Sequence, residues 1–253
     1  MRRLKISVCM ATFNGADYVT EQINSILGQL DNDDELVIVD DRSTDATLSV
    51  IREIAVRDDR IKVIAQECNI GVIRAFELAM VSSRNDLIVL SDQDDIWLSG
   101  KVEKLRSGFS EPGVSAILSN AIIFGPNQKN ETFFFPPNYH PRLSVLRQLV
   151  RNDVIGCCFS FRRELLNHAL PIPAFASMHD WWLGVVAISS GKVVYDSVPR
   201  IRYRRHDRNV SPSIRRHFSK ILLARLGNVC AIIVLLVRRY LNRKLTLQRC
   251  DGA

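Results

Sequence analysis

Short apolar runs alternate with amphipathic stretches along the first half of the chain. The apolar runs are five or six residues long and end in polar residues, which predicts buried strands. They lie at 6–11, 35–39, 60–65 and 86–90. Between them, apolar residues recur at helical spacing, which predicts helices. These helices lie at 17–29, 48–55 and 72–82. Strands separated by helices predict an α/β fold with a doubly wound, mostly parallel sheet and flanking helices.

The pattern is less regular after residue 113. It predicts a strand at 114–119, a long loop at 125–141, a further strand at 155–161, a helix at 181–189 and a last strand at 193–195. We expect one domain over residues 1–212, with halves at 1–118 and 119–212, followed by a basic helical tail at 213–253.

Polar side chains follow three of the predicted strands. They are Thr12 and Asn14, Asp40 and Asp41, and Asp92 and Asp94. Ligands of open α/β sheets bind beyond the carboxyl ends of the strands. Three polar clusters at the same edge predict a site of nucleotide size.

Asp92-Gln93-Asp94-Asp95 is the strongest chemical signal. Carboxylates two residues apart raise each other's pKa unless a cation lies between them. Oxygen ligands of this kind suit Mg²⁺ or Mn²⁺. The same pattern also arises where acidic residues cap a helix, and the residues by themselves leave both interpretations open.

Charge is unevenly distributed. The whole chain carries a net charge of +7, while the part from Arg200 onward carries 14 Lys/Arg against two acidic residues. A basic tail on a mildly acidic domain favours a membrane or polyanion contact and argues against a nucleic-acid-binding domain. The six cysteines include no Cys-x-x-Cys pair, which favours buried thiols in a reducing cytoplasm.

The tail is apolar as well as basic. Its longest uncharged run, Leu226–Val237, has 12 residues, and about 20 are needed to span a bilayer. We therefore expect residues 213–250 to form an amphipathic helix on a membrane surface. A helix packed on the core and a helix that pairs two subunits remain the alternatives.

Four segments together resemble glycosyltransferase family 2, most closely the bacterial polysaccharide branch that includes rhamnosyltransferases. The segments are Ser7-Val8-Cys9-Met10-Ala11-Thr12-Phe13-Asn14-Gly15, Val39-Asp40-Asp41-Arg42-Ser43-Thr44-Asp45, Asn69-Ile70-Gly71 and Ser91-Asp92-Gln93-Asp94-Asp95-Ile96-Trp97. The resemblance covers about residues 4–210, with the motifs in the expected order. It implies a GT-A fold, a nucleotide-sugar donor, a divalent metal and inversion at the anomeric carbon.

The resemblance assigns residues to the donor site. Thr12 and Asp41 would contact the nucleobase, where Asp41 could accept the imide N–H of uracil or thymine, while Asp40 supports the turn. Asp92 would lie near the ribose or the metal, and Asp94 would be the main metal ligand. The other donor-site residues expected are Phe13, Asn14, Asn69 and Gln93. Arg74 would reach the diphosphate, although a solvated helix face explains it better.

Two further segments match the family. In Met178-His179-Asp180-Trp181-Trp182-Leu183, Asp180 would be the base that deprotonates the acceptor hydroxyl, and His179 would support it. We expect the helix N-terminus to lower the pKa of Asp180. One of the two tryptophans could form a platform for the acceptor, or both could pack around the helix.

The second segment is Tyr203-Arg204-Arg205-His206-Asp207-Arg208-Asn209-Val210-Ser211. There the resemblance implies that Arg205 and His206 approach the diphosphate and the metal. A basic surface continuous with the tail is the alternative.

The combined interpretation is an inverting glycosyltransferase of cell-surface polysaccharide biosynthesis. It would move a sugar, with rhamnose the leading candidate, from a UDP- or dTDP-sugar to a saccharide or lipid-linked saccharide. We expect Mg²⁺ or Mn²⁺ as cofactor, a cytoplasmic protein on the inner face of the membrane, and possible oligomers through the tail. The alternatives are an inactive membrane-associated scaffold of the same fold and a sugar-nucleotide nucleotidyltransferase. The latter would need a Gly-rich basic loop after the first strand, which Thr12-Phe13-Asn14-Gly15 does not supply.

Overall fold

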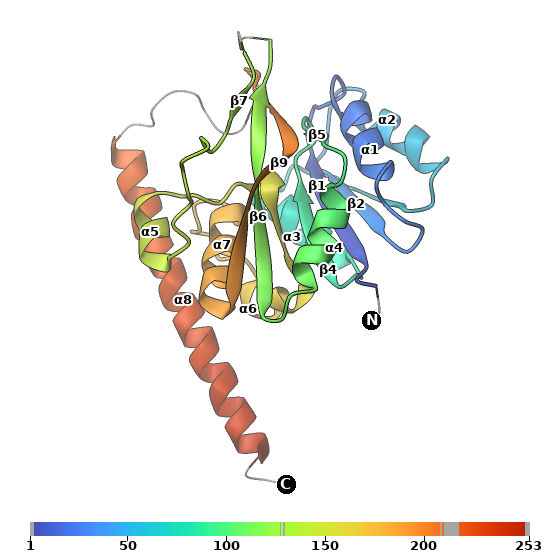
Figure 1. The fold of residues 1–253 in the computed structure, drawn as a ribbon. Coiled ribbons are helices and arrows are strands. Elements are labelled where there is room, and N and C mark those ends of the chain that lie inside the picture. Colours follow the sequence, from blue (N-terminus) through green and yellow to red (C-terminus); the bar gives the residue numbers. More distant parts are fainter. Residues whose placement is uncertain (1–2, 127, 129, 208, 210–217, 251–253) are drawn as a thin grey trace.

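A single sheet organises the molecule (Figure 1). The computed structural model describes residues 3–126, 128, 130–207, 209 and 218–250, with side chains of the last segment described over 222–241. Within these residues, nine strands pair in the order β3-β2-β1-β4-β8-β6-β9-β5, and β7 pairs with β6. The strands are β1 Ile6–Thr12, β2 Glu35–Asp40, β3 Ile61–Ala65, β4 Leu87–Ser91, β5 Ile96–Trp97, β6 Val114–Phe124, β7 Thr132–Phe133, β8 Phe159–Arg162 and β9 Lys192–Arg204.

Helices cover the sheet and extend to one side of it. They are α1 Val19–Leu27, α2 Thr47–Ala55, α3 Val72–Ser82, α4 Lys101–Phe109, α5 Val145–Val150, α6 Leu166–Ala169, α7 His179–Ser190 and α8 Phe218–Cys250, with short 3-10 turns at Gly156–Cys158 and Arg163–Leu165. The α/β fold expected from the sequence is confirmed.

The first four strands run parallel, as the alternation of strands and helices predicts. The apolar residues of β1, β2 and β4 are buried, apart from the partly exposed Ala11, so each strand reads as a near-continuous hydrophobic run. Thr12 pairs with Asp40, and Met10 pairs with Ser91. The polar clusters that follow β1, β2 and β4 therefore lie along one edge of the sheet.

The second half of the sheet is mixed and longer than its sequence pattern indicates. β8 is antiparallel to β4 and β6, and β9 is parallel to β6 over ten paired positions. The strand expected at 193–195 is only the start of β9, which continues to Arg204. Its later part carries Asp196, Arg200 and Arg202 and is partly exposed, so it has no hydrophobic run to reveal it. Pairing with β6 holds this segment in the sheet.

Two further features, the helix α4 and the tryptophans of α7, differ from the sequence expectation for identifiable reasons. The helix α4 was not expected, because its pattern is dominated by charged residues; it nevertheless buries Val102, Leu105 and Phe109. In α7, both tryptophans are buried, and each indole N–H donates to a carbonyl, from Trp181 to Gln148 and from Trp182 to Ala169. The suggestion that one of them forms an acceptor platform is wrong, because both rings are buried and neither lines the cavity described below.

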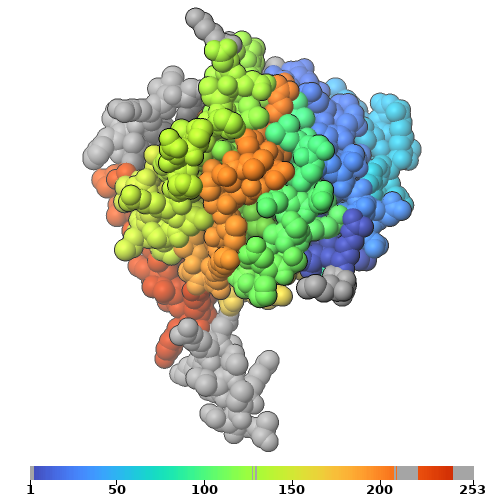
Figure 2. All heavy atoms as spheres, in the orientation of Figure 1, coloured from blue at the N-terminus to red at the C-terminus, as the bar shows by residue number. Residues whose placement is uncertain are grey.

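The helix α8 lies against α5, α6 and α7 (Figure 1). Ala231 and Leu235 are buried there, and Asn228 accepts a hydrogen bond from the backbone N–H of Ser177. Figure 2 shows the described part of α8, in red, beside the yellow-green segment of α5. One face of the tail is thus packed on the body, as the core-packing alternative requires.

The outer face of α8 is apolar and exposed. Its exposed large side chains are Leu222, Leu223, Leu226, Val229, Ile233, Leu236, Val237, Tyr240 and Leu241. Among the described residues, no helix is both long enough and apolar enough to cross a membrane.

Candidate active site

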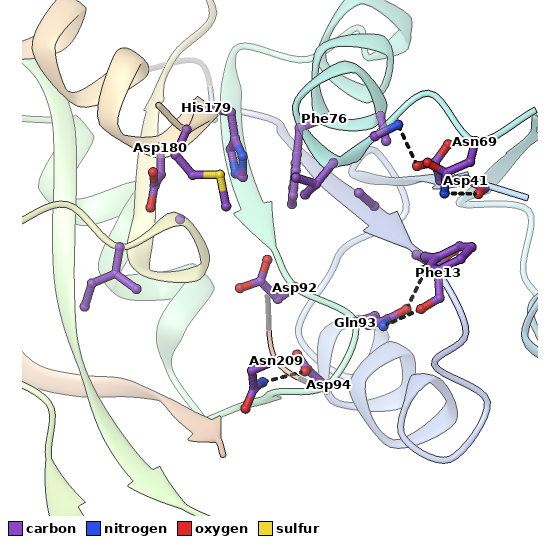
Figure 3. A pocket seen from close by; sticks show the side chains of 18 of the residues that line it. Phe13, Asp41, Asn69, Phe76, Asp92, Gln93, Asp94, His179, Asp180 and Asn209 are labelled. Atoms are coloured by element: carbon purple, nitrogen blue, oxygen red, sulfur yellow. Dashed lines mark hydrogen bonds between the residues drawn. The ribbon is translucent and has the colours of Figure 1, made fainter. Parts of the chain in front are cut away.

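A cavity of about 410 Å³ opens at the carboxyl ends of β1, β2 and β4 (Figure 3). Ligand sites of 300–1,000 Å³ are typical for small molecules and cofactors. Eight of the residues expected in the site line this cavity: Thr12, Phe13, Asp41, Asn69, Asp92, Gln93, Asp94 and Asp180. They come from the carboxyl ends of β1 to β4, with the loops that follow these strands, and from the N-terminus of α7.

At one end of the cavity, the Asp41 carboxylate fixes the loop that precedes α3. Its two oxygens accept the backbone N–H groups of Ile70 and Gly71, at 2.6 and 2.9 Å. Asn69 donates its side-chain amide to the backbone carbonyl of Asp41 at 3.1 Å. Gly71 has a φ of +82°, a conformation that glycine adopts without strain. This end of the cavity is held rigid by hydrogen bonds.

Asp40 supports the turn, as expected. It accepts the Thr12 hydroxyl at 3.0 Å, and the Ser43 backbone N–H and hydroxyl at 2.9 and 2.6 Å. Asn14 is a second brace in the same turn, because its side-chain oxygen accepts the backbone N–H of Thr44 at 2.8 Å. Asn14 does not line the cavity.

Phe13 and Gln93 form one wall of the cavity mouth. The Gln93 amide oxygen accepts the Phe13 N–H at 2.9 Å, and its nitrogen donates to the Phe13 carbonyl at 3.0 Å. This reciprocal pair joins the loop after β1 to the loop after β4. The Phe13 side chain remains 46% exposed and offers an aromatic face at the mouth.

Asp92 lies between the carboxylates of Asp94 and Asp180 (Figure 3). Burial, followed by the negative charges of Asp94 and Asp180, raises its pKa to about 7. A raised pKa means that the surroundings of this carboxylate do not stabilise its negative charge. A bound cation would remove this deficit.

Asp94 is held by the segment after β9. One of its carboxylate oxygens lies 2.7 Å from Nε2 of His206 and accepts the side-chain amide of Asn209 at 3.1 Å. The imidazole of His206 also stacks on Tyr18, with ring centroids 4.7 Å apart. The structure therefore brings His206 to Asp94, the expected metal ligand, across 112 residues of sequence.

Asp95 lies behind the cavity wall and is fully buried. It accepts the backbone N–H of Arg204 at 2.9 Å and so joins β9 to the loop after β4. Ligand atoms of Asp92, Asp95 and Cys157 lie within 4.8 Å of one another. The pKa of Cys157 is raised well above its ordinary value, chiefly by a hydrogen bond with Cys158 and by burial, so its sulfur stays protonated. A protonated thiol is a poor metal ligand, which directs a cation toward the carboxylates.

Asp180 is the second residue of α7 and points into the cavity (Figure 3). Burial raises its pKa to about 6, and hydrogen bonds from the backbone of Trp181 and Gly156 and from Asn152 only partly oppose this shift. The expectation that the helix N-terminus lowers this pKa is wrong, because loss of hydration outweighs the helix dipole. His179, expected to support Asp180, makes no hydrogen bond to it among the described contacts and lines the cavity itself.

Four expected residues do not line the cavity: Asn14, His206, Arg74 and Arg205. Arg74 is partly exposed on α3 and pairs with Glu77 at 2.5 Å. The guanidinium of Arg205 lies over the ring of Tyr203, 5.1 Å from its centroid.

Several residues that line the cavity were not expected from the sequence. Asn209 stands in a quoted motif segment, so its position was available; Phe76, Ile155 and Met178 carry no signal beyond apolar character. These three become wall residues only through the packing of α3 and α7.

Comparison with known proteins places these features in a family. The family model described as glycosyl transferase family 2 matches residues 7–170. The first curated relatives are 32–33% identical over 40–67% of this chain, and the chain spans 31–59% of their length. A dTDP-rhamnosyl transferase of Shigella flexneri is 28% identical over 79% of this chain and 72% of its own.

Solved structures show the same fold. TarS of Staphylococcus aureus, in complex with UDP-GlcNAc, aligns with a TM-score of 0.70 and 20% identity over 98% of this chain and 75% of its own. A mannosyltransferase of Pyrobaculum calidifontis, in complex with GDP-Man and Mn²⁺, aligns with a TM-score of 0.64 and 17% identity over 94% and 74%. The fold is GT-A, as expected. The chain belongs to glycosyl transferase family 2.

Proposed function

We propose that this glycosyltransferase moves a sugar from a UDP- or dTDP-sugar to a saccharide or lipid-linked saccharide acceptor, with inversion at the anomeric carbon. Rhamnose is the leading candidate for the transferred sugar, since a dTDP-rhamnosyl transferase matches most of the chain. The acceptor would belong to a cell-surface polysaccharide.

The nucleotide would occupy the rigid end of the cavity. Each Asp41 oxygen already accepts one backbone N–H, and a carboxylate oxygen has capacity for a further donor. The imide N–H of uracil or thymine would fill that capacity, while Phe13 would lie against the ring of the base. Thr12 and Asn69 would line the base site, and Gln93 would hold Phe13 in place. Asn14, Arg74 and Arg205 are assigned to the donor site by the resemblance alone.

The carboxylates at the centre of the cavity fit a Mg²⁺ or Mn²⁺ ion. Asp92 has a raised pKa because it lies near two other carboxylates, and a divalent ion is the group that such a cluster lacks. We propose Asp92, Asp94 and His206 as its ligands. Such an ion, when bound, stabilises the negative charge of a diphosphate leaving group.

Asp180 would carry the proton transfer. Its carboxylate takes the proton of the acceptor hydroxyl while that oxygen bonds to the anomeric carbon from the face opposite the diphosphate. The bond between the anomeric carbon and the diphosphate oxygen breaks, and the diphosphate leaves with the electron pair. A pKa of about 6 keeps Asp180 largely ionised at neutral pH and makes it a better base than an ordinary aspartate.

The observation that carries this proposal is the placement of Asp41, Asp92 and Asp180 along one cavity of nucleotide-sugar size. A panel of UDP- and dTDP-sugars, incubated with the protein and Mn²⁺, tests it by release of the nucleoside diphosphate. We expect one sugar to be consumed, faster with an acceptor than without, and no consumption after EDTA treatment. Failure to consume any member of the panel would refute the proposal.

We also propose that the exposed face of α8 attaches the protein to a membrane surface, where a lipid-linked acceptor would be found. The proposal is supported by apolar side chains that are at least 44% exposed on α8. They are Leu226, Val229, Ile233 and Leu236. Arg238 and Arg239 contribute less to membrane binding than the sequence indicates, because their guanidinium groups donate hydrogen bonds to the body of the protein. Arg238 donates to carbonyls at the end of α6, and Arg239 donates to Ser189 in the last turn of α7.

Co-sedimentation with anionic vesicles tests this attachment. The double variant Leu226→Ser/Ile233→Ser should remain in the supernatant, while the wild type sediments. Equal sedimentation of both would contradict it, and a change in size on gel filtration without vesicles would favour the pairing of two subunits.

A further inference from the structure

His179 is an unpartnered polar side chain on the cavity wall. It is the first residue of α7 and is 4% exposed, and neither of its ring nitrogens has a hydrogen-bond partner among the described residues. A buried polar group left without a hydrogen bond destabilises the folded state, so such groups in native structures call for an explanation.

Packing explains the ring of His179 but not its nitrogens. One face of the imidazole stacks on Phe76, with centroids 4.1 Å apart and an interplanar angle of 21°. An apolar ring of the same shape would stack equally well there. The stacking therefore fixes the orientation of the imidazole and leaves its hydrogen-bonding groups unused.

Gly156 leaves the edge of the ring uncovered. A β-carbon at Gly156 would lie 3.3 Å from Nε2 of His179, tighter than nearly all real contacts of that kind. The absence of a side chain at this position keeps space beside Nε2, and Gly156 and His179 both line the cavity. Figure 3 shows the ring between Asp180 and Phe76, on the side of the cavity that faces Asp92.

The chemistry of His179 complements that of its neighbours. Burial lowers its pKa to about 3, so the imidazole is neutral and offers one donor and one acceptor. When ionised, the carboxylates of Asp92, Asp94 and Asp180 offer only acceptors. A sugar hydroxyl needs a partner for its oxygen as well as for its hydrogen, and the imidazole supplies that donor at this end of the cavity.

We propose that His179 is a specificity-determining residue that hydrogen-bonds a hydroxyl of the transferred sugar. The inference rests on the proposed function and names the residue that reads the sugar. The position supports the transferred sugar over the acceptor, because the ring lies between Phe76 of α3 and the base Asp180. The anomeric carbon must pass through that space to meet a hydroxyl held at Asp180.

Substitution by phenylalanine isolates the nitrogens from the packing. His179→Phe preserves the ring and its stacking on Phe76, while His179→Asn restores an amide donor and acceptor on a shorter side chain. His168→Phe is the matched control, because His168 also has an unpartnered buried nitrogen but lies on α6, outside the cavity. Thermal denaturation of each variant establishes that it folds.

The readout is the affinity difference between a nucleotide and its sugar conjugate, by calorimetry with Mn²⁺. The probes are UDP, UDP-glucose and UDP-N-acetylglucosamine, and dTDP and dTDP-rhamnose. We consider the sugar conjugate that the wild type binds more tightly than the free nucleotide. In His179→Phe, the ratio of the affinity for this conjugate to the affinity for the free nucleotide should fall by roughly 5- to 100-fold. The substitution should change the affinity for the free nucleotide less than twofold, and His179→Asn should recover part of the loss.

The outcomes separate this inference from the function on which it rests. Unchanged affinity and unchanged acceptor KM in His179→Phe would overturn the inference and leave the transferase intact. A rise in acceptor KM without loss of donor affinity would overturn it in favour of acceptor recognition. Absence of nucleotide binding in the wild type would instead refute the proposed function.

Discussion

The two ends of the cavity are built on opposite principles. At the end beside β2, the Asp41 carboxylate is satisfied on both oxygens by backbone N–H groups, and Asn69 ties the same loop to β2. At the end beside α7, burial raises the pKa of Asp92 to about 7 and that of Asp180 to about 6, and His179 has no hydrogen-bond partner among the described residues.

This difference suits the Asp41 end of the cavity to binding the nucleotide and the α7 end to the transfer reaction. A preorganised end positions a ligand without changing its own protonation or conformation. An under-satisfied end gains its missing partners only when a cation and a sugar arrive, so its favourable interactions are reserved for the loaded state. The unsatisfied groups are therefore the ones on which we expect substitutions to act most strongly.

The largest effect is expected at Asp180. Asp180→Asn removes the proton acceptor but keeps size and polarity, so transfer should fall by about 10²–10⁴-fold while nucleotide binding is kept. Transfer rates and calorimetric titration with UDP measure the two quantities separately. The matched control is Asp196→Asn, a carboxylate on β9 outside the cavity, which should transfer at the wild-type rate. Unchanged turnover in Asp180→Asn would rule out this residue as the base.

A smaller loss is expected at the preorganised end. Asp41→Asn replaces one acceptor oxygen by an amide N–H₂ that faces a backbone N–H, so UDP affinity should fall roughly 10-fold. CDP, whose base lacks the imide N–H, should lose less, and the ratio of the two affinities reports the contact directly. Asp45→Asn, in the same turn but outside the cavity, serves as control. An equal loss of affinity for UDP and CDP would show that Asp41 only stabilises the loop before α3 and does not contact the base.

The pH dependence of turnover tests the burial of the base. Because Asp180 must be ionised to accept a proton and its pKa is raised to about 6, kcat/KM should fall about tenfold per pH unit below pH 6. An aspartate with an ordinary pKa would keep its activity to about pH 4. Nucleotide-sugar consumption between pH 4.5 and 8 measures the position of the fall, and a fall only near pH 4 would contradict the burial of this carboxylate.

The smallest effect concerns stability without metal. The pKa of Asp92 is higher in the folded state than in the unfolded state, so the folded state binds this proton more tightly. The free energy of unfolding therefore falls as the pH rises from about 4 to about 7. Asp92→Asn removes this charge and should raise the Tm by a few degrees at pH 8 in EDTA, with little difference near pH 4. Thermal scans at both values measure it. A lower Tm for the variant at pH 8 would show that Asp92 stabilises the folded state by contacts of its own.

The sequence predicts the parallel half of the fold well because its signals are local. Continuous apolar runs such as that of β4 need no partner to be recognised, and the polar residue that follows each run marks its end. The later part of β9 has no such run, and α4 has few apolar residues, so both depend on contacts with β6 that sequence periodicity does not contain.

The site divides in the same way. Asp92, Asp94 and Asp180 follow from residue type and motif order, and the structure brings all three to one cavity. The direction of the Asp180 pKa shift could not be predicted, because it depends on burial in the packed protein, which outweighs the hydrogen bonds from Trp181, Gly156 and Asn152. The role proposed for His179 could not be predicted from the sequence either, because only the packed structure reveals that its ring nitrogens lack hydrogen-bond partners among the described residues.

Metal-dependent nucleotide binding tests the central claim most directly. Calorimetric titration of UDP and dTDP into the protein, with and without Mn²⁺, should show tighter binding with the metal in the wild type. In Asp94→Asn, the metal should give little or no gain, while binding without metal should match the wild type. Wild-type affinity that is the same with and without Mn²⁺ would contradict a metal-bound diphosphate at Asp92 and Asp94.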